Sequence, residues 1–199
     1  LCKPAILRRQ KNPISPMLKF TCCNEVRRFS EASQAQLLRG LVRGYERECL
    51  RVDGNGQLAL TPHPSALGAK LTHPWITTDY AEALLEFITP PSSEPDFPIA
   101  FLTDIHRFSA QQLSGEYLWA GSMPCRIGPD ASIAIANYGQ SNDARFKMAY
   151  REGLGLRYGR AMQTIAGAHY NWSLPDAFWP ALRDCCGGEG DQQQFISNR

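Results

Sequence analysis

Residues 45–52 form a mixed run of apolar and charged residues that ends in a turn signal, and we predict a β-strand for it. A strand turns every second side chain to the same face, so Glu46 and Glu48 should point the same way. Two adjacent carboxylates repel each other, an arrangement that ordinary strands avoid unless a cation lies between them. The turn sequence 53–56, Asp-Gly-Asn-Gly, follows and predicts a hairpin whose second strand covers residues 57–60.

Three helices are predicted from apolar residues that recur at helical spacing. The first covers residues 31–42 and is ended by Gly44. The second begins with a capping-box-like Ser93 and runs to about residue 113, with a core-facing stripe of Phe101, Ile105 and Phe108. The third covers residues 142–160, and its buried stripe would consist of residues four apart: Phe146, Tyr150, Leu154, Tyr158 and Met162.

Two further strands are expected after the proline-rich loop 61–74. Residues 75–89 fit a strand or a helix, and we prefer the strand because threonine and isoleucine begin it. Residues 163–174 alternate between a polar front, which includes His169, and an apolar back. An amphipathic fragment at 177–182 and a Gly- and Gln-rich loop at 185–194 follow. This mixture of helices with antiparallel strands indicates an α+β fold.

Composition changes this picture little. The chain has 199 residues, 43% of them hydrophobic and 20% charged, which is typical of one globular domain, and no apolar run long enough to span a membrane. Seven cysteines without C-x-x-C spacing favour a reduced, cytoplasmic protein over a zinc or disulfide protein.

Charge is concentrated at the N-terminus, where residues 1–28 contain seven Lys or Arg and one Glu. This segment fits a nucleic-acid arm, a transit peptide or, as we prefer, a tail foreign to the domain. We therefore expect three parts: a basic, disordered or non-homologous segment at 1–30, a catalytic-domain part at 31–184, and a Gly/Gln-rich loop at 185–199.

Acidic residues on the predicted strands are the candidates for chemistry. They are, together with one imidazole, Glu46, Glu48, Asp79, Glu82, Glu86 and His169. Carboxylates and imidazole suit Mg²⁺ or Mn²⁺, which share their coordination with the phosphates of a nucleotide. Each residue taken singly also fits a solvated strand face or a hydrogen-bonded sheet histidine. The chain has no Walker A, G-x-G-x-x-G or G-x-S-x-G motif, and Cys125 fits a structural thiol at least as well as a reactive one.

Several long strings resemble the bacterial glutamate–cysteine ligases of the proteobacterial type. They are Gly44–Val52, Leu71–Tyr80, Ala81–Pro90, Ser122–Cys125, Tyr150–Leu154 and Met162–Asn171, spread over residues 34–179. The resemblance implies ATP-dependent joining of glutamate and cysteine into γ-glutamylcysteine through γ-glutamyl phosphate, the first step of glutathione synthesis. It also implies a fold like glutamine synthetase, with a curved, mainly antiparallel sheet and helices on its outer face.

The resemblance assigns roles to particular residues. Glu46, Glu48, Asp79, Glu86 and His169 would hold Mg²⁺ or Mn²⁺, and Tyr80, Tyr150, Leu154 and Gln163 would lie around the amino-acid substrates. A cytoplasmic monomer with no nucleic-acid partner is expected. Because the family is longer, we expect a truncated N-terminal part, inactive on its own. The alternatives are a degenerate, non-catalytic fragment that binds at most metal or a complementing chain, and an RNA-binding piece.

Overall fold

The computed structural model describes residue 34 and residues 36–186. All its strands belong to one compact unit, Gly40–Pro175. The described residues outside this unit belong to a second one, which includes helix α5 (Phe178–Cys186). Our predictions for residues 1–30 and 187–199 lie outside the described residues. In the part that the structure describes, no helix is both long and apolar enough to cross a membrane.

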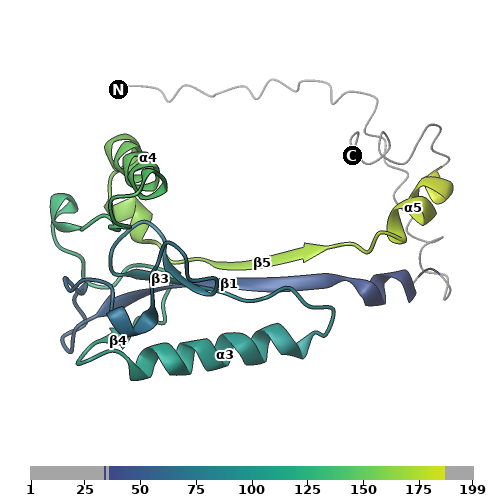
Figure 1. The fold of residues 1–199 in the computed structure, drawn as a ribbon, viewed down its shortest axis with the longest axis horizontal. Helices are drawn as coiled ribbons and strands as arrows, with labels where there is room; N and C mark the ends of the chain where they lie inside the picture. The colour runs from purple at the N-terminus through teal and green to yellow at the C-terminus, as the bar shows by residue number, and fades with distance from the viewer. Residues whose placement is uncertain (1–33, 35, 187–199) are drawn as a thin grey trace, which may run out of the picture. The chain divides into compact units, whose positions relative to one another are not determined.

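The unit is built on one sheet whose described strand pairs are all antiparallel (Figure 1). Its strands are β1 (Val42–Val52), β2 (Ile76–Thr78), β3 (Leu84–Ile88), β4 (Tyr117–Leu118) and β5 (Ala168–Ser173). β1 is central, because it pairs with β3 along one edge and with β4 and β5 along the other. The prediction of an α+β fold with a mainly antiparallel sheet is confirmed.

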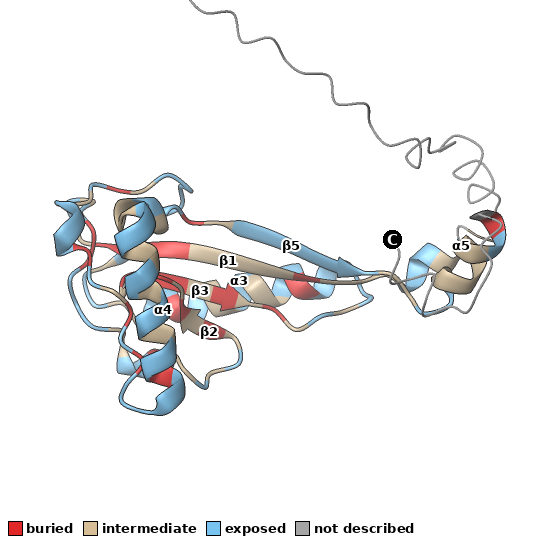
Figure 2. Cartoon of the chain, turned by 90° about the horizontal axis from the view of Figure 1, so that it is seen from above, coloured by how far each residue is buried: buried red, intermediate tan, exposed pale blue. Residues whose placement is uncertain are grey.

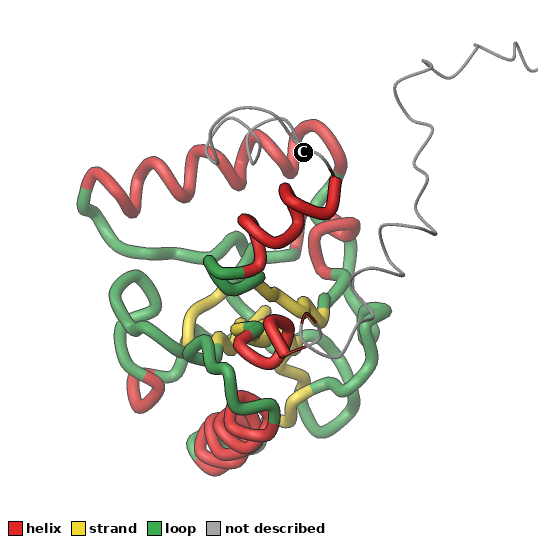
Figure 3. The backbone as a smooth tube through the Cα atoms, turned by 90° about the vertical axis from the view of Figure 1, so that its right-hand side faces the viewer, coloured by secondary structure: helices red, strands yellow, loops and turns green. Residues whose placement is uncertain are grey.

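Two long helices lie on opposite sides of this sheet, α3 (Asp96–Gln111) and α4 (Asn142–Tyr158) (Figures 1 and 3). Leu102 and Ile105 of α3 pack against a buried cluster that contains Cys49, Leu85 and Phe87. On the other side, Leu154 of α4 packs against a second cluster, whose members include Leu50, Tyr80, Leu84 and Ile133. Because strand side chains alternate, the even-numbered residues of β1 face the side of α4.

The start of the unit differs from the prediction. Instead of a helix over 31–42, the described residues form a 3₁₀ turn, η2 (Gln36–Gly40), and β1 already begins at Val42. Gly44 lies inside β1, where Thr89 packs against it and accepts a hydrogen bond from the Tyr45 amide. Residues 57–60 form single bridges rather than a strand, because the Leu58 amide donates to Arg126.

Residues 75–89 form two strands, not one. A turn separates β2 from β3, and in it the Leu84 amide donates to Ala81 and the Asp79 amide to Leu84. α3 begins at Asp96, three residues later than predicted, so Pro95 and not Ser93 occupies the N-cap and no side chain caps the helix. Of its predicted stripe, Ile105 packs inward and Phe101 contacts Trp75 edge-on, whereas Phe108 is exposed.

The predicted buried stripe of α4 is wrong, since Phe146, Tyr150, Tyr158 and Met162 are exposed and only Leu154 packs on the core. Ala144 and Met148 face inward instead, because they pack against Tyr138. Strand β5 is shorter than predicted. It begins at Ala168, after a 3₁₀ turn, η5 (Ala161–Thr164), and two further short turns are η3 (Ser65–Leu67) and η4 (Asp130–Ser132).

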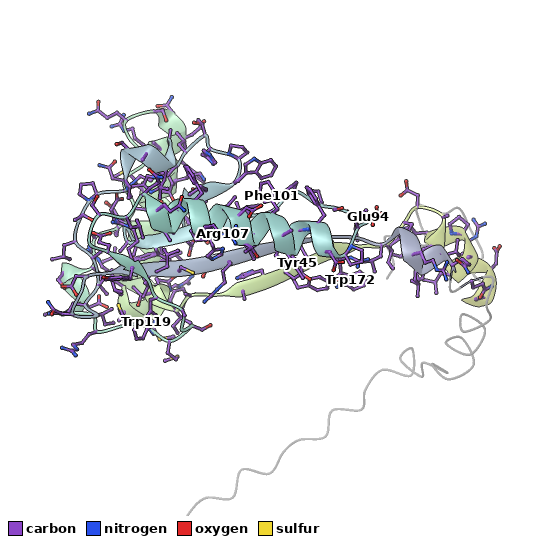
Figure 4. The ribbon with its side chains drawn as sticks, turned by 90° about the horizontal axis from the view of Figure 1, so that it is seen from below. Tyr45, Glu94, Phe101, Arg107, Trp119 and Trp172 are labelled. Carbon is purple, nitrogen blue, oxygen red and sulfur yellow. The ribbon has the colours of Figure 1, made fainter. Side chains whose placement is uncertain are left out.

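The back of β5 is exposed rather than buried (Figure 2). Tyr170 and Trp172 lie on that side, and Figure 4 shows Trp172 beside Tyr45 in the view from α3. Cys185 and Cys186 belong to α5, so the predicted loop at 185–194 is wrong for these two residues.

Two glycines of α4 lead to opposite expectations for the same substitution. A methyl group at Gly155 would collide with the Tyr80 hydroxyl, whereas one at Gly153 would meet nothing within 4 Å. Gly153→Ala should therefore raise the unfolding free energy by about 0.5–1 kcal/mol, the usual gain of helix propensity. Gly155→Ala should lower it by about 1–3 kcal/mol, the usual result of overpacking. Urea denaturation measures both values, and equal effects of the two variants would contradict the contact.

Candidate functional site

Three glutamates share the face of the sheet that lies toward α4. Glu46 and Glu48 are even-numbered residues of β1 and so face α4, and Glu86 of β3 lies directly opposite Glu48 in the strand register. Glu46 in turn lies opposite His169 of β5. Glu46 and Glu48 thus lie on one face, as predicted. The register of β3 and β5 adds Glu86 and His169 to that face.

One oxygen of the Glu46 carboxylate and one of the Glu48 carboxylate accept a hydrogen bond from the protein. The Asn171 side chain donates to Glu46 Oε1 at 2.8 Å, and the Gly167 amide donates to Glu48 Oε2 at 2.6 Å. The remaining oxygens both face His169, whose Nδ1 is 3.8 Å from Glu46 and whose Nε2 is 3.8 Å from Glu48. His169 therefore lies between the two glutamates.

Gly167 is required for this arrangement. A methyl group at residue 167 would lie 2.5 Å from His169 Nε2 and 3.3 Å from Glu48 Oε2. Only a residue without a side chain lets the backbone approach both groups so closely.

Asp79 joins the three glutamates from the end of β2. Its main-chain carbonyl accepts hydrogen bonds from Arg151 Nε of α4 at 2.6 Å and from the Tyr138 hydroxyl at 3.0 Å. Its carboxylate is 43% exposed and lies 3.8 Å from Arg151 Nη2. The aspartate thus has one face toward solvent and a backbone fixed by two side chains.

Burial and the repulsion between carboxylates raise the pKa values of two glutamates in the site, Glu86 and Glu48. Burial and then the negative charges of Asp79, Glu48 and Glu46 raise the pKa of Glu86 to about 7. Burial also raises the pKa of Glu48, with a further contribution from Asp79, although the hydrogen bond from Gly167 opposes it. A group of carboxylates that raise one another's pKa values attracts a cation.

The donor set fits a divalent cation, because it offers carboxylate oxygens and one imidazole. Among residues 34 and 36–186, however, no three His, Cys, Asp or Glu side chains already converge on one point. Glu46 and Glu48 each use an oxygen for a protein donor instead. Binding would therefore require side-chain rotation of the glutamates toward an ion.

Glu82, the sixth candidate from the sequence, lies elsewhere. Both of its oxygens accept from Lys70 Nζ at 2.5 Å, and the amides of His63 and Asn137 donate to it as well. These bonds lower the pKa of Glu82 against the effect of its burial. Glu82 therefore connects the segments that carry His63, Lys70 and Asn137. The single strand predicted over 75–89 did not indicate these contacts.

The four residues predicted around the substrates lie in different environments. Tyr80 is 1% exposed, and its hydroxyl has no hydrogen-bond partner among the described residues. Tyr150 is exposed on α4, Leu154 is half-buried against the core, and Gln163 lies in η5. Burial raises the pKa of the Cys125 thiol, which disfavours the thiolate that a nucleophile needs.

Sequence patterns did not single out Tyr138 and Arg151, although both bind the Asp79 carbonyl. Arg151 lies next to Tyr150 in one of the strings of the family resemblance, which was a usable signal. Tyr138 lies in a loop, where no periodicity could indicate its contacts.

The family model for glutamate–cysteine ligase matches residues 26–199. A glutamate–cysteine ligase of Alcanivorax borkumensis is 56% identical over 168 residues, 84% of this chain and 32% of that protein. One of Pseudomonas aeruginosa is 55% identical over 166 residues, 83% of this chain and 32% of that protein. The chain thus spans about a third of the length of these curated relatives.

Solved structures agree with these sequence matches. A glutamate–cysteine ligase of Francisella tularensis in complex with AMP is 40% identical with a TM-score of 0.72, over 75% of this chain and 30% of that one. A bifunctional glutathione synthetase of Pasteurella multocida is 31% identical with a TM-score of 0.73, over 86% and 21%. Because the family model extends over most of the sequence and the fold matches as well, the chain belongs to the glutamate–cysteine ligase family.

Proposed function

We propose that this chain forms the metal and nucleotide part of a glutamate–cysteine ligase, which makes γ-glutamylcysteine from ATP, L-glutamate and L-cysteine. The observation that carries the proposal is the face on which Glu46, Glu48 and Glu86 lie beside Asp79 and His169, with raised pKa values for Glu48 and Glu86. The AMP complex of the Francisella tularensis relative supports the nucleotide.

In this proposal the five residues Glu46, Glu48, Asp79, Glu86 and His169 hold Mg²⁺ or Mn²⁺. The ion would neutralise phosphate charge and orient the nucleotide. Asn171 and the Gly167 amide hold Glu46 and Glu48 at their positions on the sheet. His169 lies within 3.8 Å of both glutamates and limits how far each can turn.

The reaction has two steps. The γ-carboxylate of glutamate attacks the γ-phosphorus of ATP, which releases ADP and gives γ-glutamyl phosphate. The amine of cysteine then attacks that acyl carbon, loses a proton and displaces inorganic phosphate. Tyr150, Leu154 and Gln163 would border the amino acids, and Tyr80, which is buried, would support α4 from below. We propose a cytoplasmic monomer on the family resemblance alone.

A chimera tests the proposal, because the chain spans a third of its relatives. The matching 168 residues of the Alcanivorax borkumensis ligase are replaced by those of this chain, and phosphate release from ATP is measured. We expect release only when glutamate and cysteine are both present. Glu48→Gln should weaken Mn²⁺ binding and reduce release at least about tenfold, since losing even an outer-shell partner has such effects.

Glu94→Gln is the matched control, because Glu94 is an exposed glutamate two residues before α3, away from this face (Figure 4). It should behave like the unchanged chimera. A chimera that binds Mn²⁺ and releases no phosphate would favour the degenerate, non-catalytic alternative. One in which Glu48→Gln binds Mn²⁺ normally would refute the metal site.

A further inference from the structure

Tyr138 has an unusual position for a loop residue. It is buried at 7% exposure, and its hydroxyl lies 2.5 Å from the carbonyl of Thr78 and 3.0 Å from that of Asp79. One hydroxyl group therefore binds the last residue of β2 and the aspartate that follows it. Neither bond belongs to the regular hydrogen bonding of the sheet.

Cations surround the ring of Tyr138. Lys147 Nζ lies 5.2 Å and Arg151 Cζ 4.8 Å from the ring centroid, and Lys70 Nζ lies 5.9 Å from it. Cations over an aromatic face are attracted to it, which fixes the ring. Arg151 also donates its Nε hydrogen to the Asp79 carbonyl. The Arg151 guanidinium thus packs on the Tyr138 ring, and both side chains donate a hydrogen bond to the Asp79 carbonyl.

Asp79 needs such support because the sheet ends there. β2 has three residues, and beyond its end the Asp79 amide donates to the Leu84 carbonyl across the turn. Its carboxylate is partly exposed, and its charge acts on Glu86 and Glu48. Any displacement of this peptide group moves the carboxylate relative to Glu48 and Glu86.

We propose that Tyr138 is a positioning residue, which sets the place of the Asp79 carboxylate within the site through the carbonyls of Thr78 and Asp79. It acts through these two carbonyls and is not a catalytic residue. The proposal deepens the proposed function, since the position of Asp79 has a consequence for catalysis only where Asp79 binds the cation.

Tyr138→Phe in the full 199-residue chain tests it, because phenylalanine keeps the ring between the cations and removes only the hydroxyl. Hydrogen exchange is followed by NMR at the Asp79 and Leu84 amides, with the Trp119 amide, which donates to Leu50 at the opposite edge, as internal reference. We expect exchange at Asp79 and Leu84 to become about tenfold faster than at Trp119, the usual effect of losing one buried hydrogen bond. Mn²⁺ affinity, measured by the EPR signal of free Mn²⁺, should fall about tenfold.

Thr78→Val is the matched control. It also removes a buried hydroxyl one residue from Asp79, but within the part of the chain that the structure describes this hydroxyl has no hydrogen-bond partner, so neither measurement should change. Equal acceleration at all three amides in Tyr138→Phe would show a purely structural role and overturn the proposal. So would faster exchange at Asp79 with unchanged Mn²⁺ affinity. If the unchanged chain binds no Mn²⁺, the proposed metal site fails, and exchange at Asp79 still decides whether Tyr138 positions that residue.

Discussion

Replacing Arg51 with methionine should lower the free energy of unfolding by about 3–5 kcal/mol, the range for breaking a buried ion pair. Arg51 is fully buried, and its guanidinium donates to Glu116 at 2.6 Å, to the hydroxyl and carbonyl of Thr61, and to the carbonyl of Glu82. Methionine would fill much of the same space but leave these acceptors, one of them charged, without their donor. Urea denaturation monitored by far-UV circular dichroism measures the loss.

Two further variants test whether the loss comes from the uncompensated charge of Glu116 and from the burial of the ion pair. Arg51→Met combined with Glu116→Gln should recover part of the loss, because no uncompensated charge remains. Arg107→Met removes an exposed arginine paired with Asp104 at 2.8 Å and should change stability by less than about 1 kcal/mol. If Arg51→Met were as mild as Arg107→Met, the buried network would not support the strand that carries the candidate site.

Glu86→Gln should stabilise the chain at alkaline pH and leave it unchanged near pH 4. Burial and the charges of Asp79, Glu48 and Glu46 raise the pKa of Glu86 from 4.5 to about 7. The folded state therefore keeps a proton that the unfolded state loses, and the unfolding free energy falls as pH rises from about 4.5 to about 7. Glutamine cannot ionise, so at pH 8 the variant should be more stable by on the order of 2 kcal/mol.

Urea denaturation at pH 4, 6 and 8 measures this difference. With Mn²⁺ at pH 8 the order of stability should reverse, because the ion favours the ionised Glu86 and glutamine offers no charge to it. Glu94→Gln should follow the unchanged chain at every pH, since Glu94 lies outside the site. A difference between Glu86→Gln and the unchanged chain that is the same at pH 4 and pH 8 would contradict the raised pKa.

Local sequence patterns predicted the elements that their own residues stabilise. Alternation placed Glu46 and Glu48 on one face of β1, and helical spacing found α3 and α4 to within a few residues of their ends. The same patterns were wrong about the inward face of α4, because Phe146 and Tyr150 are apolar and correctly spaced but have no neighbouring surface in the described structure. Spacing reports which residues share a face, whereas packing decides which face is covered.

The family resemblance, carried by strings such as Gly44–Val52, identified the set of site residues, but it contained no distances. That Glu48 faces Glu86 and Glu46 faces His169 follows from strand register, which is fixed by contacts between residues far apart in the chain, such as Glu46 and Asn171, 125 positions apart. Glu82 shows the limit most clearly. The strand predicted over 75–89 would place Glu82 on the same face as Glu86. Glu82 lies instead in the turn between β2 and β3, where it binds Lys70.

By itself, the sequence of this protein determined its α+β class, its family and the acidic face of β1, since these depend on residue types and short spacings. The tertiary structure alone decided which carboxylates meet, that the pKa values of Glu48 and Glu86 rise, and that Tyr138 binds the Asp79 carbonyl. The physical reason is that desolvation, charge repulsion and hydrogen bonding act over a few ångströms of space, and chain separation says little about which groups come that close.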